Sequence, residues 1–148
     1  GKYKKVIMRW LLALLIVALP TMAWAEIGQI KLLVGQVSLE RDGRMTLAEK
    51  GQLIEASDII VTGSDGRVGI TFTDNTRFSA GPGSRIELIK FAFDPATHEG
   101  EFLSKVNQGS LAVVSGDIAK HQPDAMKVQT PTSILGIRGT KFMIKVTP

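Results

Sequence analysis

The chain has 148 residues, with 18 basic and 14 acidic side chains and no cysteine. Four of the basic residues and none of the acidic ones lie in residues 1–25, so residues 26–148 carry 14 of each sign. This balance excludes binding to nucleic acid or to an anionic membrane through overall charge. Because no disulfide is available, residues 26–148 must be held together by a hydrophobic core, and a chain of that length buries enough surface for one.

The N-terminal 25 residues have the pattern of a secretory signal peptide. Four basic residues precede an apolar run from Trp10 to Pro20, and Ala23 and Ala25 follow at the positions that signal peptidase recognises. An uncleaved anchor is the alternative, but a run of 11 residues is well short of the ~20 that span a bilayer as a helix. We therefore expect cleavage before Glu26, export to the periplasm and no stable membrane insertion afterwards.

After residue 25, short β-favouring runs alternate with turn residues, and no linker or low-complexity stretch divides the chain. The sequence therefore predicts one all-β domain over residues 26–148, a compact sandwich, roll or short solenoid-like fold of roughly nine or ten strands. A helix is a weak alternative only at 46–56, where Gly51 interrupts the pattern. The expected strands are 30–39, 58–63, 67–73, 77–80, 85–93, 101–106, 110–116, 125–130 and 140–146.

One hairpin can be predicted in register. A three-residue loop over 74–76 would pair Phe72 with Phe78 and keep both rings on the core face. A two-residue loop over 74–75 would instead turn Phe78 to the opposite face, so we expect the longer loop. Asn75 suits it, because asparagine tolerates the left-handed backbone that such loops use.

Residues that carry catalysis or bind metals are sparse. His98 and His121 lie in polar stretches rich in turn residues, where a solvated histidine is the usual occupant. One acidic cluster is a candidate metal site, but its spacing matches no zinc or calcium motif. The sequence therefore predicts no enzyme, no cofactor and no bound metal. The members of that cluster are Asp94, His98, Glu99 and Glu101.

Four stretches resemble, in order, the FecR-type periplasmic domain of the ferric-citrate regulator family: residues 35–44, 57–88, 107–116 and 128–142. The last stretch, "VQTPTSILGIRGTKF", contains the family signature. The resemblance implies that the signature residues have a structural or partner-binding role. They are Thr130, Pro131, Gly136, Arg138, Gly139, Thr140 and Phe142.

The resemblance also implies a function. It suggests a stand-alone secreted member, a non-enzymatic binding or scaffold domain that engages a protein partner of the cell envelope, in envelope or iron-uptake signalling. Attachment to a glycan or to peptidoglycan is the alternative. Neither the partner nor the oligomeric state follows from the sequence, and no nucleic-acid partner is expected.

Arg138 is the unusual residue of the signature, because it lies in an apolar run. In 141–146 the even positions are apolar, and extending this alternation backwards through Thr140 places Arg138 on the core side. We therefore expect a buried guanidinium paired with a carboxylate. The alternatives are a bulge at Gly139 that turns the side chain to solvent, and a partner-binding or anion-binding role. The candidate carboxylates are Asp58, Asp74 and Asp117.

Overall fold

The computed structural model describes residues 26–148, so the predicted signal peptide lies outside the described residues. Within them the chain forms twelve strands, one short α-helix and one 3₁₀ turn, in the order β1 (Glu26–Val34), β2 (Val37–Arg41), β3 (Arg44–Leu47), β4 (Leu53–Glu55), β5 (Ile59–Thr62), β6 (Arg67–Phe72), β7 (Arg77–Ala80), β8 (Arg85–Phe93), β9 (Gly100–Val114), α2 (Asp117–His121), η1 (Pro123–Ala125), β10 (Met126–Gln129), β11 (Ile134–Gly136) and β12 (Lys141–Val146). The predicted all-β class is confirmed, with more strands than expected.

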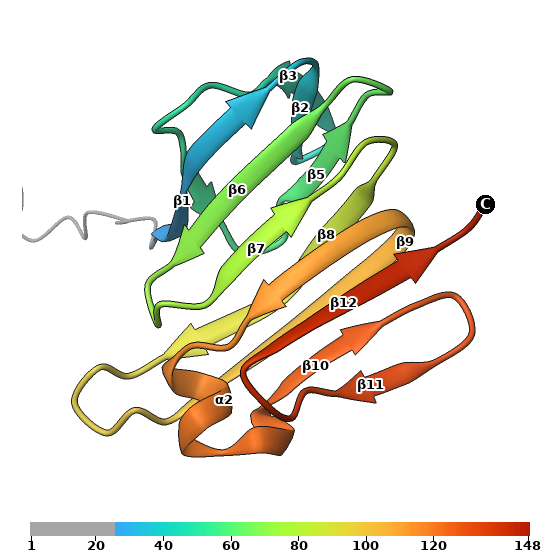
Figure 1. Cartoon of the computed structure of the whole chain (residues 1–148). Helices are drawn as coiled ribbons and strands as arrows, with labels where there is room; N and C mark the ends of the chain where they lie inside the picture. The colour runs from blue at the N-terminus through green and yellow to red at the C-terminus, as the bar shows by residue number, and fades with distance from the viewer. Residues whose placement is uncertain (1–25) are drawn as a thin grey trace, which may run out of the picture.

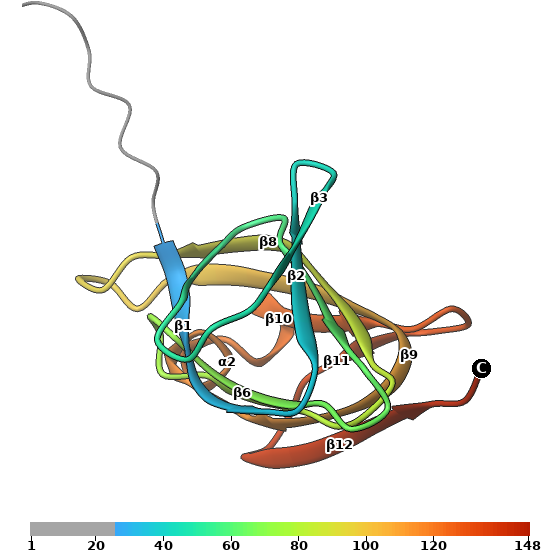
Figure 2. The ribbon, with the colours of Figure 1, turned by 90° about the horizontal axis from the view of Figure 1, so that it is seen from above.

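The strands form one curled sheet whose two halves face each other across the core (Figures 1 and 2). The front sheet, nearer to the viewer in Figure 1, has the order β4, β1, β6, β7, the second part of β9, and β12. The back sheet has the order β3, β2, β5, β8, the first part of β9, β10 and β11. Paired strands are antiparallel except β9 and β10, which run parallel. The fold is therefore a roll.

The 15-residue strand β9 belongs to both sheets and bends between them. The bend is at Gly109, whose φ of 94° lies in the left-handed region. A Cβ at this position would clash with the backbone of Ser84, so the two backbones approach too closely for a side chain. The sequence predicted two strands here, 101–106 and 110–116. The structure joins these two apolar runs into one strand that bends between them.

The core lies between the two sheets and follows from strand alternation. In β6 the inward positions Val68, Ile70 and Phe72 are buried, as are Phe78 and Ala80 in β7. Phe102 of β9 lies at the centre of an aromatic cluster that joins the sheets. Its ring centroid is 4.7 to 5.2 Å from the centroids of the other three rings, Phe72, Phe78 and Phe91.

One sequence expectation was wrong about where a strand ends. The run 30–39 is two strands, because Gly35 adopts a φ of 66° and turns the chain between β1 and β2. The weak helix alternative over 46–56 is not a helix. β3 ends and β4 begins within it, and Gly51 lies between them with a φ of 88°.

The predicted 72–78 hairpin has the expected faces but a different register. Ile70, not Phe72, lies opposite Phe78, and the loop consists of residues 73–75. Because this displacement is two residues, both rings still point inward, and their centroids are 4.8 Å apart. Asn75 has the expected left-handed backbone, with a φ of 70°.

No helix within residues 26–148 has the length and apolar character needed to span a bilayer.

Candidate functional site

Residues 130–142, here called the C-terminal segment, begin with a tight turn between β10 and β11. The Thr130 N–H donates to the Ser133 carbonyl at 2.8 Å, and the Ser133 N–H donates to the Thr130 hydroxyl at 3.1 Å. Pro131 occupies the second position of this turn, where its fixed φ is favourable. Thr130 and Pro131 therefore have a local structural role, which is to form the β10–β11 hairpin.

The end of the segment is attached to β9. The Ser115 hydroxyl donates to the Gly139 carbonyl at 2.8 Å, and the Ser115 N–H donates to the Thr140 carbonyl at 2.8 Å. Phe142 is half-buried and packs against the core, and Gly136 lies opposite Lys127 in the β10–β11 ladder. Six of the seven signature residues are thus accounted for by the fold, through a turn, strand pairing, hydrogen bonds to β9 or core packing, and Arg138 is the exception.

Arg138 is not buried, contrary to the sequence prediction. Its side chain is 77% exposed, and its Nη2 lies 3.4 Å from the Asp124 Oδ1, on a side chain that is itself 69% exposed. Gly139 has a φ of 93°, which breaks the strand alternation between Arg138 and Phe142. Ile137 becomes the inward residue in place of Arg138. Of the alternatives considered, the phase change at Gly139 is the one that the structure contains.

Asp58, a predicted partner of Arg138, is bound by Arg41 instead. The buried carboxylate accepts hydrogen bonds from Nε and Nη2 of Arg41, both at 2.8 Å, and from the Glu55 N–H at 2.8 Å. The hydrogen bond to Asp58 is the main reason why the pKa of Arg41 is raised above its usual value. Arg41 was missed by the sequence analysis, although it continues the inward alternation of Val37 and Leu39 in β2.

Asp74 and Asp117 do not contact Arg138 either. The buried Asp74 carboxylate accepts hydrogen bonds from the Thr76 N–H at 3.0 Å, the Thr76 hydroxyl at 2.8 Å and the Ile118 N–H at 3.2 Å. It therefore fixes the 73–75 loop and the start of α2 together. Asp117 lies in the first turn of α2 and accepts a 3.4 Å hydrogen bond from the Asn75 amide.

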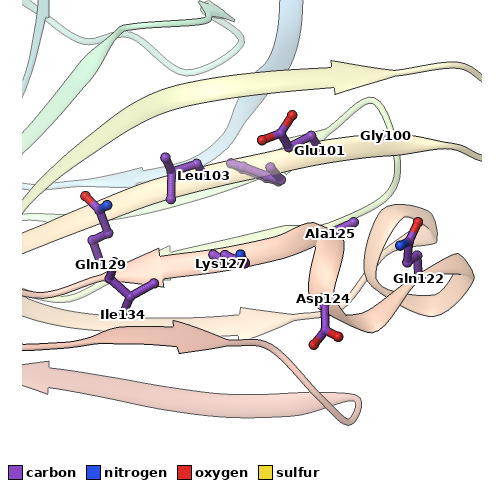
Figure 3. A pocket seen from close by; sticks show the side chains of 10 residues that line it. Gly100, Glu101, Leu103, Gln122, Asp124, Ala125, Lys127, Gln129 and Ile134 are labelled. Atoms are coloured by element: carbon purple, nitrogen blue, oxygen red, sulfur yellow. The ribbon is translucent and has the colours of Figure 1, made fainter.

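Next to the β10–β11 hairpin lies an open groove of about 460 Å³ (Figure 3). Residues 100–103 of β9 form one side. The other side is formed by Gln122, Asp124, Ala125, Lys127, Gln129 and Ile134. Its two carboxylates are each close to a cation, Glu101 at 2.9 Å from the Lys90 Nζ and Asp124 beside Arg138. The groove is thus polar at its rim, with Ile134 and Leu103 as apolar contacts.

The hairpin exposes large apolar side chains as well. Ile134 is 64% and Leu135 is 41% exposed. Among the described strands, β11 pairs only with β10, so one edge of β11 has free backbone donors and acceptors. We use the name hairpin face for the exposed surface around β11, which consists of Ile134 and the groove on its outer side, Leu135 on its other side, and Arg138. Unlike the other parts of the C-terminal segment, the side chains of Ile134, Leu135 and Arg138 are largely exposed and are not required by the packing of the domain.

Apart from Glu101, which lines the groove, the histidines and the acidic cluster lie elsewhere. His98 is exposed, with its Nδ1 3.9 Å from the Asp117 Oδ2, and His121 is exposed at the end of α2. Asp94 accepts a hydrogen bond from the Ala96 N–H in the turn that follows β8, and Glu101 pairs with Lys90. Over residues 26–148, no group of three or more His, Asp or Glu side chains is arranged to hold a metal ion.

Comparison with known families decides what kind of domain this is. Residues 58–148 match the family described as FecR protein, which is more than half of the chain. The chain belongs to the FecR family. Proteins of this family act in envelope and iron-uptake signalling. The FecR match includes β5 to β12, and so contains the whole hairpin face. No curated protein and no solved structure matches the chain significantly.

Proposed function

We propose that this FecR domain is a non-enzymatic binding domain of the periplasm, which engages a protein partner in the cell envelope through the hairpin face. One observation carries the proposal: the hairpin face exposes Ile134, Leu135 and Arg138 although the rest of the C-terminal segment is used to hold the fold. An exposed arginine beside exposed aliphatic side chains is the composition that protein interfaces favour.

The free edge of β11 suggests how a partner binds. An extended segment of the partner would pair with this edge through backbone hydrogen bonds, as in strand addition. Its alternate side chains would contact Ile134 and the groove, and a carboxylate of the partner would replace Asp124 at the Arg138 guanidinium. Because the Arg138–Asp124 contact is long and exposed, exchanging it costs little free energy.

The surroundings of the two carboxylates in the groove favour binding over catalysis. Glu101 and Asp124, the carboxylates that line it, are each close to a cation, and neither has a serine or histidine beside it in the lining. General acid or base catalysis usually uses a buried group, whereas the side chains of Glu101 and Asp124 are 55% and 69% exposed.

Photocrosslinking from the hairpin face tests the proposal. A photoreactive amino acid is placed at Leu135, or at the control position Leu47 of β3, which is 72% exposed on a different edge. In intact cells we expect one discrete protein adduct from position 135, weakened by Arg138→Glu, and a different pattern from position 47. No adduct from position 135, or the same adducts from both positions, would contradict the proposal.

Attachment to a glycan or to peptidoglycan is tested in parallel by sedimentation with purified cell wall. The chain offers little for stacking on sugar rings, because Tyr3, Trp10 and Trp24 all lie before residue 26. We expect the domain to stay in the supernatant. Co-sedimentation that Leu135→Asp abolishes would favour the glycan function instead.

A further inference from the structure

The outer surface of the front sheet, here called the front face, is a second surface that the domain does not use for its own packing. It carries exposed apolar side chains at both sides, Leu32 at 54% on β1 and Met143 at 71% on β12. These two belong to one row across the sheet, in which strand pairing places Gly69, Ser79 and Ala112 between them. In Figure 1 this surface is turned toward the viewer.

The row is hollowed in its middle. A shallow depression of about 260 Å³ is lined by Leu32 and Met143, by Arg67 and Val68 of β6, and by small residues in or next to β7 and β9. Four strand spacings of about 4.8 Å separate β1 from β12, so the apolar side chains of Leu32 and Met143 are about 19 Å apart. That width accommodates an α-helix, which with its side chains measures about 10 to 12 Å across.

The front face is also strongly basic. Arg67, Arg77, Lys141 and Lys145 project from its outward positions, and all four are exposed. Among residues 26–148, none of the four forms an ion pair with a carboxylate. The outward positions of β6, β7, β12 and the second part of β9 contain no Asp or Glu. Although residues 26–148 have no net charge, positive charge is thus concentrated around the apolar depression.

We propose that the front face docks an amphipathic α-helix of another protein, with an apolar stripe over the depression and Asp or Glu side chains along both flanks. The apolar stripe contacts Leu32 and Met143. The acidic flanks face Arg67 on one side and Lys141 and Lys145 on the other. This inference is independent of the hairpin face, because the two surfaces share no residue.

The backbone of the sheet favours a helix over an extended peptide. The strands beneath the depression, β6, β7 and the second part of β9, are each paired on both sides. An extended segment lying there finds no backbone donors or acceptors, and its own would be left unpaired. A helix satisfies its backbone internally and needs only side-chain contacts.

Two other occupants, a second copy of the chain and an anionic membrane, fit the front face less well. In a second copy of the chain the same four cations would be brought together, which opposes face-to-face association. An anionic membrane matches the charge, but a flat lipid surface does not fill a depression, and attraction of about 1 kcal/mol per basic residue gives weak binding for four.

Two designed peptides test the proposal. One is a helix of about 18 residues with a leucine stripe and glutamate flanks, and the control has lysine in place of each glutamate. Binding to ¹⁵N-labelled domain 26–148 is followed by NMR. We expect the glutamate peptide to shift the amides of Gly69, Ala112 and Met143, with an affinity that falls as salt is added.

Matched variants locate the site. Lys141→Glu with Lys145→Glu should lower the affinity by about tenfold or more, and Met143→Ser should lower it further. Arg44→Glu with Lys50→Glu changes the net charge equally, at exposed positions on another part of the domain, and should leave it unchanged. The proposal is overturned if the lysine peptide binds equally, if both charge reversals act alike, if the shifts lie elsewhere, or if phosphatidylglycerol vesicles bind and the peptide does not.

Discussion

The two arginines of this domain that contact an aspartate should differ sharply in their effect on stability. Arg41 donates two hydrogen bonds to Asp58, whose side chain is only 1% exposed, whereas Arg138 has one long contact to the exposed Asp124. Arg41→Ala leaves a buried carboxylate with only the Glu55 N–H as donor. Arg138→Ala leaves a carboxylate that water solvates freely.

The magnitudes follow from these environments. Breaking a fully buried ion pair from one side costs about 3 to 5 kcal/mol. The Arg41 side chain is 34% exposed, so water partly replaces it, and we expect Arg41→Ala to lower the free energy of unfolding by about 2 to 4 kcal/mol. Arg138→Ala should cost less than about 0.5 kcal/mol, as exposed pairs do.

Urea denaturation followed by far-UV circular dichroism measures both variants, since residues 26–148 contain no tryptophan or tyrosine for fluorescence. A double-mutant cycle with Asp58→Asn isolates the pair, and we expect a coupling of about 1 kcal/mol or more between positions 41 and 58. Equal losses from Arg41→Ala and Arg138→Ala, or a coupling near zero, would refute the reasoning.

Four further outcomes are expected. Phe102→Ala should lower the free energy of unfolding by about 3 to 5 kcal/mol, because it removes the centre of the aromatic cluster; a midpoint like that of the wild type in thermal denaturation would contradict this. Ser104→Ala should raise it by about 1 kcal/mol, since the buried hydroxyl has no hydrogen-bond partner, and a loss would mean that the hydroxyl is satisfied. Gly109→Ala should cost about 2 kcal/mol or more through its left-handed φ and contact with Ser84, whereas Gly43→Ala, also left-handed but with open space around it, should cost less in the same urea assay. Exported protein should begin at Glu26 by intact-mass measurement, and a retained leader would indicate an anchored protein.

Much of the fold could be predicted from local patterns. Alternation identified nine stretches that contain or overlap strands, and inward faces such as those of Phe72 and Phe78 were correct. The short strands β3, β4 and β11 were not found, because each has only three or four residues, too few for an alternating pattern to identify a strand. The helix α2 was not found either. Its Ile118 N–H is bonded by Asp74, 44 positions away in sequence, and no local cap marks its start.

The candidate site was predicted only in part. The sequence singled out the C-terminal segment, which the structure places beside the groove. It gave the wrong environment for Arg138, because the alternation of 141–146 was extended through Gly139, where a left-handed residue breaks it. The same argument applied to β2 would have found Arg41, which follows Val37 and Leu39 on the inward side.

The sequence by itself determined where most of the strands lie, which side chains of those strands face the core, and the family signature, because these depend on the spacing of neighbouring residues. Only the tertiary structure decided which carboxylate meets which arginine, where β9 bends from one sheet to the other, and which apolar side chains remain exposed. Those features depend on contacts between residues far apart in the chain, such as Arg41 with Asp58 and Gly109 with Ser84. Strand alternation specifies the face that a side chain occupies, but the partner on that face is set by the order and register of the strands.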